Sequence, residues 1–125
     1  MGPLALAAAV LLGSLGAGPA QAQSAAECVS PQTQSLMNAC AYMKYEQADA
    51  ALNAAWKPAK AFGDEIGKGD ALLTAQRTWI AYRDAACDAH ASPYEGGSIQ
   101  SLIRANCLSA LTAGRTRMLL EFHGY

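Results

Sequence analysis

Apolar residues recur at alternating spacings of three and four in the first half of the chain, which is the period of one buried face of an α-helix. Two candidate N-caps place the start of this helix between residues 31 and 34. Pro58 predicts that the helix ends or kinks near Trp56 or Lys57. The apolar seam of the helix consists of Met37, Ala41, Tyr45, Ala48, Leu52 and Ala55.

A second helix is predicted after a connection at residues 61–70, which hold three glycines and mixed charge. Asp70 can cap this helix, and the apolar pattern continues to about Ala91. Residues 92–98 form a turn by composition, and Ser98 can cap a third helix.

The third helix completes the predicted architecture. Gly114 in its interior costs about 1 kcal/mol relative to alanine, which predicts a close helix contact at that position. No strand alternation or internal repeat is present in the sequence. Three amphipathic helices joined by short turns predict an all-α, up-down-up three-helix bundle. The apolar seam of the third helix consists of Ile103, Cys107, Leu111, Gly114, Met118 and Phe122.

A charged residue interrupts the apolar face of the second predicted helix. At 100° per residue, Gln76, Arg83 and Cys87 stack within about 40° of one another. An unpaired guanidinium on a buried face is prohibitively costly, so Arg83 must either extend to the surface or meet an acid.

Two carboxylates are candidate partners for that guanidinium. Asp84 projects about 100° away from Arg83 and is a poor direct partner, whereas Asp49 lies at the edge of the first helix's apolar face. We predict a buried polar layer in which Asp49 pairs with Arg83 and Asn53 pairs with Gln76. The alternative is simple surface exposure of these groups. If the ion pair is buried, replacing Asp49 by Ala should cost about 3 to 5 kcal/mol.

The first 22 residues carry no charged side chain, contain a short apolar run and end in Ala-Gln-Ala. We interpret residues 1–22 as a signal peptide cleaved after Ala22, which leaves residues 23–125 as a single secreted or periplasmic domain. No lipid-anchor cysteine follows the cleavage site, so no membrane anchor is expected. The formal net charge of −1 gives no electrostatic footprint for nucleic acid or an anionic membrane.

Four cysteines in an exported domain of about 100 residues indicate disulfides, because a core of that size often needs covalent support. An antiparallel hairpin of the second and third helices makes a Cys87–Cys107 bridge geometrically reasonable, which leaves Cys28–Cys40. Crossed pairings stay open. There is no CxxC, and the only close Cys–His pair is Cys87 with His90, so no metal, thiol chemistry or cofactor is expected.

Sequence motifs of enzymes are missing from the chain. It has no GxSxG, HExxH or glycine-rich phosphate loop, and its acidic residues fall where solvated helix faces or caps would place them. A small three-helix bundle also offers little concave volume for a substrate. No catalytic residue is therefore expected, and a small hydrolase is the remote alternative.

Four motifs follow one another along the chain: AD-x-x-LN on the first helix, Q-x-x-W-x-x-Y-R-D-x-x-C on the second, a GGS turn, and C-L-x-x-x-T-x-x-R on the third. In this order, they resemble the lysozyme inhibitor LprI-like family of small secreted bacterial domains. The resemblance extends from about Gln34 to Leu120. The motif residues are Ala48, Asp49, Leu52, Asn53, Gln76, Trp79, Tyr82, Arg83, Asp84, Cys87, Gly96, Gly97, Ser98, Cys107, Leu108, Thr112 and Arg115.

The resemblance implies a non-enzymatic interaction module of the bacterial envelope, with lysozyme or another envelope or extracellular protein as its partner. An inhibitor of this kind needs a protruding, preorganised element, and the turn between the second and third helices is the candidate. The alternative is that the turn is an ordinary connection and that the protein is a structural or accessory envelope protein. That alternative predicts an exposed apolar patch involving Tyr42, Trp56 or Phe62. The candidate partner-binding turn consists of Tyr94, Glu95, Gly96, Gly97 and Ser98.

Overall fold

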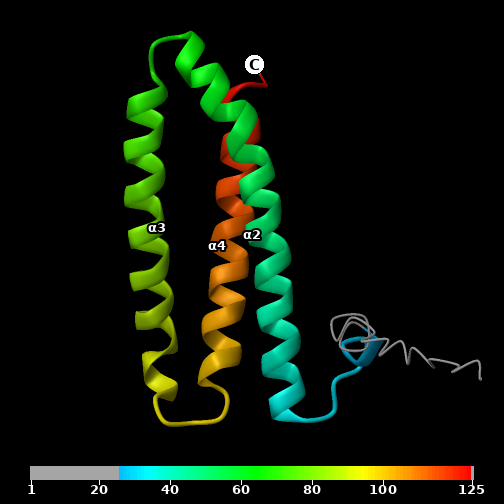
Figure 1. Cartoon of the computed structure of the whole chain (residues 1–125). Coiled ribbons are helices and arrows are strands. Elements are labelled where there is room, and N and C mark those ends of the chain that lie inside the picture. The colour runs from blue at the N-terminus through cyan, green and yellow to red at the C-terminus, as the bar shows by residue number, and fades with distance from the viewer. Residues whose placement is uncertain (1–25, 125) are drawn as a thin grey trace, which may run out of the picture.

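Three long helices form the protein, running up, down and up (Figure 1). They are α2 (Gln34–Glu65), α3 (Gly69–Ala91) and α4 (Gln100–Phe122), with a 3-10 turn, η1 (Ser92–Tyr94), after α3. The structure is a computed structural model that describes residues 26–124, and within them it has no strand. The predicted all-α, up-down-up bundle is confirmed. The predicted signal peptide, residues 1–22, lies outside the described residues.

Helix α2 begins as predicted but ends later. Thr33 is its N-cap, and the Thr33 hydroxyl accepts a hydrogen bond from the Leu36 backbone N–H at 3.1 Å. Of the two outcomes predicted at Pro58, an end near Trp56 or Lys57 is wrong, because the helix continues through Pro58 to Glu65. Figure 1 shows the last turns of α2 leaning toward α3, in keeping with the other outcome, a kink. Pro58 lies on the exposed side of the helix, where water can satisfy the carbonyl group that its missing N–H leaves free. Apolar packing on the opposite side continues past it.

The turn between α2 and α3 is tighter than the predicted ten-residue connection. Gly67 has φ of 71°, the left-handed conformation that glycine adopts without strain. Lys68 is the N-cap of α3 and makes no side-chain capping bond, so the prediction of Asp70 as the cap is wrong. Asp70 instead lies in the first turn of α3, where its charge favours the positive end of the helix dipole.

A close approach of two glycines joins α2 to α3. A Cβ built on Gly63 would lie 3.3 Å from the Gly69 Cα atom, and a Cβ built on Gly69 would overlap the Asp64 carboxylate. A side chain at either position would therefore force a neighbouring group to shift. The predicted close contact at Gly114 is wrong, because a Cβ there would meet only the flexible end of Arg117, at 3.7 Å.

Helix α4 turns a different face inward from the one predicted. The predicted seam of Ile103, Cys107, Leu111, Gly114, Met118 and Phe122 is not the buried face, since Met118 is 58% exposed and the other five residues are of intermediate exposure. The face that is buried carries two leucines, and α4 packs more closely against α2 than against α3. Its N-cap is Ile99 rather than the predicted Ser98. The buried residues of α4 are Ala105, Leu108, Thr112 and Leu119.

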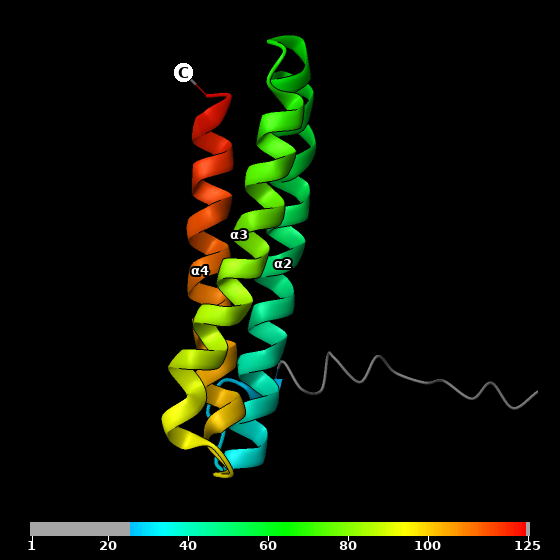
Figure 2. The same ribbon diagram turned by 90° about the vertical axis from the view of Figure 1, so that its left-hand side faces the viewer.

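The apolar core lies toward the end of the bundle that carries the α2–α3 turn. Phe62 and Phe122 meet there edge to face with ring centroids 5.4 Å apart. Figure 2 shows α3 in front of α4 and α2, and α3 runs antiparallel to the other two helices. No helix within residues 26–124 combines the length and apolarity needed to cross a membrane. The core consists of Leu52, Ala55, Ala59 and Leu119, surrounded by Trp56, Leu72, Trp79 and Phe122.

Two disulfides hold the opposite end. Cys28 bonds to Cys40 and Cys87 bonds to Cys107, with Cα atoms 5.6 Å and 5.5 Å apart. The Cys28–Cys40 bridge joins the segment that precedes α2 to α2 itself, and the Cys87–Cys107 bridge joins α3 to α4. The crossed pairings that sequence left open do not occur.

Candidate functional site

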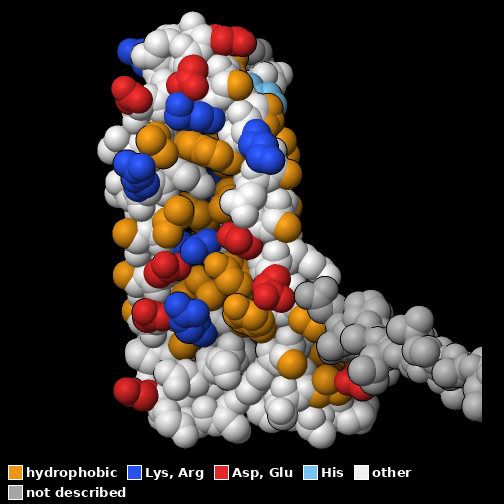
Figure 3. All heavy atoms as spheres, in the orientation of Figure 1, with side chains coloured by type: hydrophobic (Ala, Val, Ile, Leu, Met, Phe, Trp, Pro, Cys, Tyr) orange, Lys and Arg blue, Asp and Glu red, His pale blue; other side chains and the backbone are white. Residues whose placement is uncertain are grey.

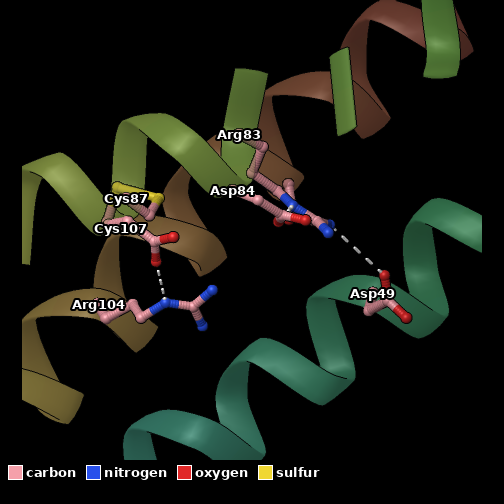
Figure 4. Close-up of polar contacts among 8 residues, drawn as sticks. Asp49, Arg83, Asp84, Cys87, Arg104 and Cys107 are labelled. Carbon is pink, nitrogen blue, oxygen red and sulfur yellow. Dashed lines mark hydrogen bonds and ion pairs between the residues drawn. A yellow bond between two sulfur atoms is a disulfide. The ribbon is translucent and has the colours of Figure 1, made fainter. Parts of the chain in front are cut away.

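Arg83 of α3 lies at the centre of a polar layer that joins all three helices. Its side chain is 8% exposed and reaches toward α2 (Figure 4). Its Nε atom lies 3.0 Å from Asp84 Oδ1, and its Nη1 atom lies 3.8 Å from Asp49 Oδ1. The same Nη1 group donates to the fully buried Thr112 hydroxyl of α4 at 3.5 Å. One guanidinium therefore contacts every helix of the bundle.

Two aromatic rings enclose the same guanidinium. Its Cζ atom lies 5.2 Å from the centroid of the Trp79 ring and 5.5 Å from that of Tyr45. A cation over a ring face is attracted by the ring quadrupole. Burial raises the pKa of the Tyr45 hydroxyl above its ordinary value, although the positive charge of Arg83 opposes that rise. The rings thus help to hold the buried charge.

The structure forms part of the predicted polar layer and rearranges the rest. Asp49 faces Arg83 as predicted, but Asp84 is the closer carboxylate, because it meets the Nε atom while the Nη1 atom extends toward α2. The predicted pairing of Asn53 with Gln76 is wrong. Asn53 is exposed and its Nδ2 group donates to Asp49 at 3.5 Å.

Gln76 instead bonds to α4. Its Oε1 atom accepts from Arg115 Nε at 2.8 Å. Burial lowers the pKa of Arg115, and its Nη2 atom is buried without a hydrogen-bond partner among the described residues. The sequence analysis placed Thr112 and Arg115 in a motif but gave neither a structural role. Their spacing of three puts both on one helical face, which could have indicated that they lie in the polar layer together.

Below the polar layer, a second ion pair lies on the surface. Arg104 Nε of α4 lies 2.6 Å from Asp88 Oδ1 of α3, and this bond raises the pKa of Arg104 (Figure 4). Tyr42 of α2 lies nearby and is 54% exposed, with its ring 6.0 Å from that of Tyr45. Both aromatic and charged groups are therefore available to a partner on this side.

The candidate partner-binding turn lies at the end of the bundle that carries the disulfides. Gly96 has φ of 79°, a conformation that requires glycine, and Tyr94 is 43% exposed. Asn38 of α2 donates from Nδ2 to the Ser98 carbonyl at 2.8 Å, and the Gly97 N–H donates to the Tyr94 carbonyl at 2.9 Å. The turn is thus bonded to the helix opposite as well as to its own flanks.

The predicted apolar patch is only partly present. Tyr42 is exposed, but Trp56 packs against the core and Phe62 contacts the Phe122 ring, so neither is free on the surface.

The hollow beside the Cys28–Cys40 bridge lacks the group of ionisable side chains that catalysis usually requires. One of about 480 Å³ lies beside the Cys28–Cys40 bridge, and Lys44 is the one ionisable side chain among its described lining residues. Within residues 26–124, no three His, Cys, Asp or Glu side chains gather where they would hold a metal ion. This hollow therefore offers no acid–base pair.

Comparisons with known proteins agree with this architecture. The family described as Lysozyme inhibitor LprI matches residues 24–119. A protein of Rhizobium meliloti (strain 1021), described only as uncharacterized, is 35% identical over an alignment of 116 residues; the match covers 82% of this chain and 84% of the relative. No solved structure matches the chain. The polar layer described above consists largely of residues in the motifs that suggested this family, and the chain belongs to the LprI lysozyme inhibitor family.

Proposed function

We propose that this protein is an exported, non-enzymatic interaction module that inhibits a lysozyme. The observation that carries this function is the anchored turn at residues 94–98, in a chain whose family is described by lysozyme inhibition. An inhibitor gains affinity when its contact element is already held in the bound shape, because less conformational freedom is lost on binding. The turn meets that requirement.

Three bonds support the preorganisation of the turn. The Cys87–Cys107 disulfide ties together the helices on either side. The Asn38 amide holds the Ser98 carbonyl from across the bundle. The Ser92 hydroxyl donates to the Ala89 carbonyl at 2.7 Å, which secures the end of α3. The exposed Tyr94 and Glu95 side chains therefore project from a fixed backbone.

A lysozyme turnover assay with the purified protein tests this function. We expect inhibition at micromolar concentrations or below, and we expect the double variant Y94A/E95A to inhibit at least about tenfold less well, which is about 1.4 kcal/mol of binding free energy. A matched control is I66A, which removes an exposed apolar side chain at the other end of the bundle. Unimpaired lysozyme turnover at micromolar protein would contradict the proposed function.

Export is part of the same proposal. Two disulfides are typical of proteins that fold in an oxidising compartment, which supports a secreted or periplasmic location. We expect the exported protein to begin at Gln23 after removal of residues 1–22. Intact mass of the protein recovered from the periplasm or medium measures this directly, and a mass that retains residues 1–22 would exclude cleavage.

A second candidate function is favoured by the exposed Tyr42. An accessory envelope protein that binds another partner would use such an aromatic side chain as an anchor. The two functions differ in one measurement, because only the first predicts that the wild-type protein inhibits lysozyme. If it does, a Y42A variant should keep full inhibition when the turn alone makes the contact. Loss of inhibition in Y42A would instead place that side chain in the lysozyme contact.

A further inference from the structure

Arg115 of α4 differs from the other two arginines that join helices to one another. Arg83 meets two carboxylates and Arg104 meets one. Arg115 bonds instead, through Nε, to the neutral amide oxygen of Gln76. Among residues 26–124 it takes part in no ion pair, and its buried Nη2 atom has no hydrogen-bond partner there. A partly buried cation of this kind is stabilised when an anion reaches it.

An open hollow of about 470 Å³ lies beside Arg115, where α4 meets Trp79 of α3. None of its described lining residues comes from α2, and Figure 2 shows α2 on the opposite side of α3 from α4. Sites for small molecules have volumes of about 300 to 1,000 Å³, so a ligand of that size fits here. We call this site the α3–α4 hollow, and its lining includes Trp79, Leu111, Gly114, Arg115, Arg117 and Met118.

Gly114 deepens the α3–α4 hollow. Glycine weakens the interior of a helix relative to alanine, and no close packing contact requires it at this position. A Cβ built there would lie 3.7 Å from Arg117 Nη2, an ordinary van der Waals distance. The same distance places the Arg117 guanidinium beside the bare backbone of Gly114. The missing side chain therefore leaves space next to a second cationic group.

Cationic groups outnumber carboxylates in the α3–α4 hollow. Glu121 is the one acid among its described lining residues, and no ion pair of the described chain joins it to Arg117, four residues earlier. On the face shown in Figure 3, which α2 and α3 largely form, Lys and Arg side chains lie among Asp and Glu side chains. The hollow thus combines an excess of positive charge with the apolar surfaces of Trp79 and Met118.

We propose that the α3–α4 hollow binds a small organic acid, whose carboxylate meets the two arginines and whose apolar part lies against Trp79 and Met118. Hydrogen bonds between guanidinium and carboxylate groups are strong because both partners are charged. Contact with the apolar walls removes the rest of the ligand from water. The site goes beyond the proposed function, because the turn at residues 94–98 lies beyond the other end of α4.

The two tryptophans of the chain provide the test, because Trp79 lines the α3–α4 hollow and Trp56 lines a different one. Heteronuclear NMR follows both indole N–H groups while phenylbutyrate is added, and a W56F variant assigns them. We expect a saturable shift of the Trp79 resonance, with a dissociation constant of about 1 mM or below, which is about −4 kcal/mol. No such shift at millimolar phenylbutyrate, or an equal shift of the Trp56 resonance, would overturn the inference.

Two other ligands separate the contributions of charge and apolar contact. Phenylbutanol keeps the apolar part and lacks the carboxylate, and inorganic phosphate has charge without the apolar part. We expect each to bind at least about tenfold more weakly than phenylbutyrate, because each loses one of the two contacts. Phenylbutanol that binds as tightly as phenylbutyrate would overturn the inference, because the arginines would then make no contribution.

Variants of the charged groups locate the carboxylate. R117Q should weaken phenylbutyrate binding several-fold, and E121Q should strengthen it, because a competing negative charge is removed. The matched control is R77Q, which removes the same charge from an exposed arginine beside Trp56. Equal weakening by R117Q and R77Q would overturn the inference, because binding would then follow net charge. R115Q is less decisive, because it also removes the bond to Gln76.

Variants at Gly114 separate the hollow from the stability of the fold. G114L should fill the hollow and abolish phenylbutyrate binding, whereas G114A adds one methyl group and should keep most of it. Both variants should melt at the wild-type temperature or above, because leucine and alanine favour a helix more than glycine does. Phenylbutyrate binding by G114L that equals the wild-type value would overturn the inference.

Discussion

Around the α2–α3 turn, the helices are held by large apolar side chains, whereas near the α3–α4 turn they are held by disulfides, ion pairs and hydrogen bonds. Leu119 is fully buried at the first end, among aromatic rings. At the second end, the buried side chains are mostly small, and covalent bonds substitute for apolar area. Directional bonds fix individual groups in place, which suits the end that carries the candidate contact surfaces.

The largest expected effect is at the apolar end. L119A should destabilise the protein by about 3 kcal/mol, because a fully buried leucine leaves a cavity when it is truncated. Chemical denaturation measures the change in the free energy of unfolding. The neighbouring L120A, which truncates a half-exposed side chain, should change stability by at most about 0.5 kcal/mol. Equal losses in the two variants would mean that the core is not where the structure places it.

Removal of one bridge tests the other end. C87A/C107A should cost about 3 kcal/mol through the greater freedom of the unfolded chain. It should also increase hydrogen exchange in the turn at residues 94–98 more than around the α2–α3 turn. If exchange rose equally at both ends, the two regions would not be independently held.

Arg83 lies between the two regions, and two substitutions separate the contribution of its side-chain packing to stability from that of its charge. R83A should cost about 2 kcal/mol, through loss of the contacts with Trp79, Tyr45 and Thr112. R83M should recover much of that loss, because Asp49 and Asp84 stay partly exposed and hydrated when the charge is removed. A thermal melt compares them; R83M as unstable as R83A would show that the charge itself is required.

The cost of removing Asp49 is expected to be smaller than the sequence suggested. Its side chain is 42% exposed and lies 3.8 Å from a guanidinium that Asp84 also contacts. D49A should therefore cost about 1 kcal/mol rather than 3 to 5. The same thermal melt measures it, with E46A as a control at a nearby exposed acid.

The smallest effect concerns alkaline pH. Because the folded protein raises the pKa of Tyr45 above its ordinary value of 10.0, the unfolded chain loses this proton first as pH rises. The stability from a neutral Tyr45 is complete below pH 10 and is lost as pH rises through the folded pKa. Y45F should show a shallower loss of stability above pH 10, and identical alkaline profiles for the two proteins would contradict this assignment.

The three helices and the buried face of α3 could be predicted from sequence, because the helical spacing of buried positions remains visible even where some of them are polar. Gln76, Arg83 and Cys87 were placed on one face by spacing alone, and all three are buried. The end of α2 was missed because Pro58 lies on the exposed side, a fact that depends on tertiary packing. The inward face of α4 was missed because the predicted seam and the set that is buried, Ala105, Leu108, Thr112 and Leu119, both follow helical spacing, so spacing alone does not choose between them.

Partners in the polar layer were harder to predict than its members. The predicted inward face of α4 did not include Thr112 or Arg115. The hydrogen bonds of Thr112 with Arg83 and of Arg115 with Gln76 therefore could not be predicted. Pairing also depends on side-chain length, since the Arg83 side chain is long enough to contact Asp84 through Nε and to approach Asp49 of α2 through Nη1. Spacing identified the buried face of α3 but not that of α4, and the partner of each polar group follows from the positions of all three helices.

The short separations of the two disulfides bear on how the protein is assembled. The cysteines of each bridge are 12 and 20 residues apart, and the two loops do not overlap along the chain. An exported chain that emerges N-terminus first presents Cys28 and Cys40 together before Cys87 has appeared. Cys28 and Cys40 can then pair before either cysteine of the second bridge is available.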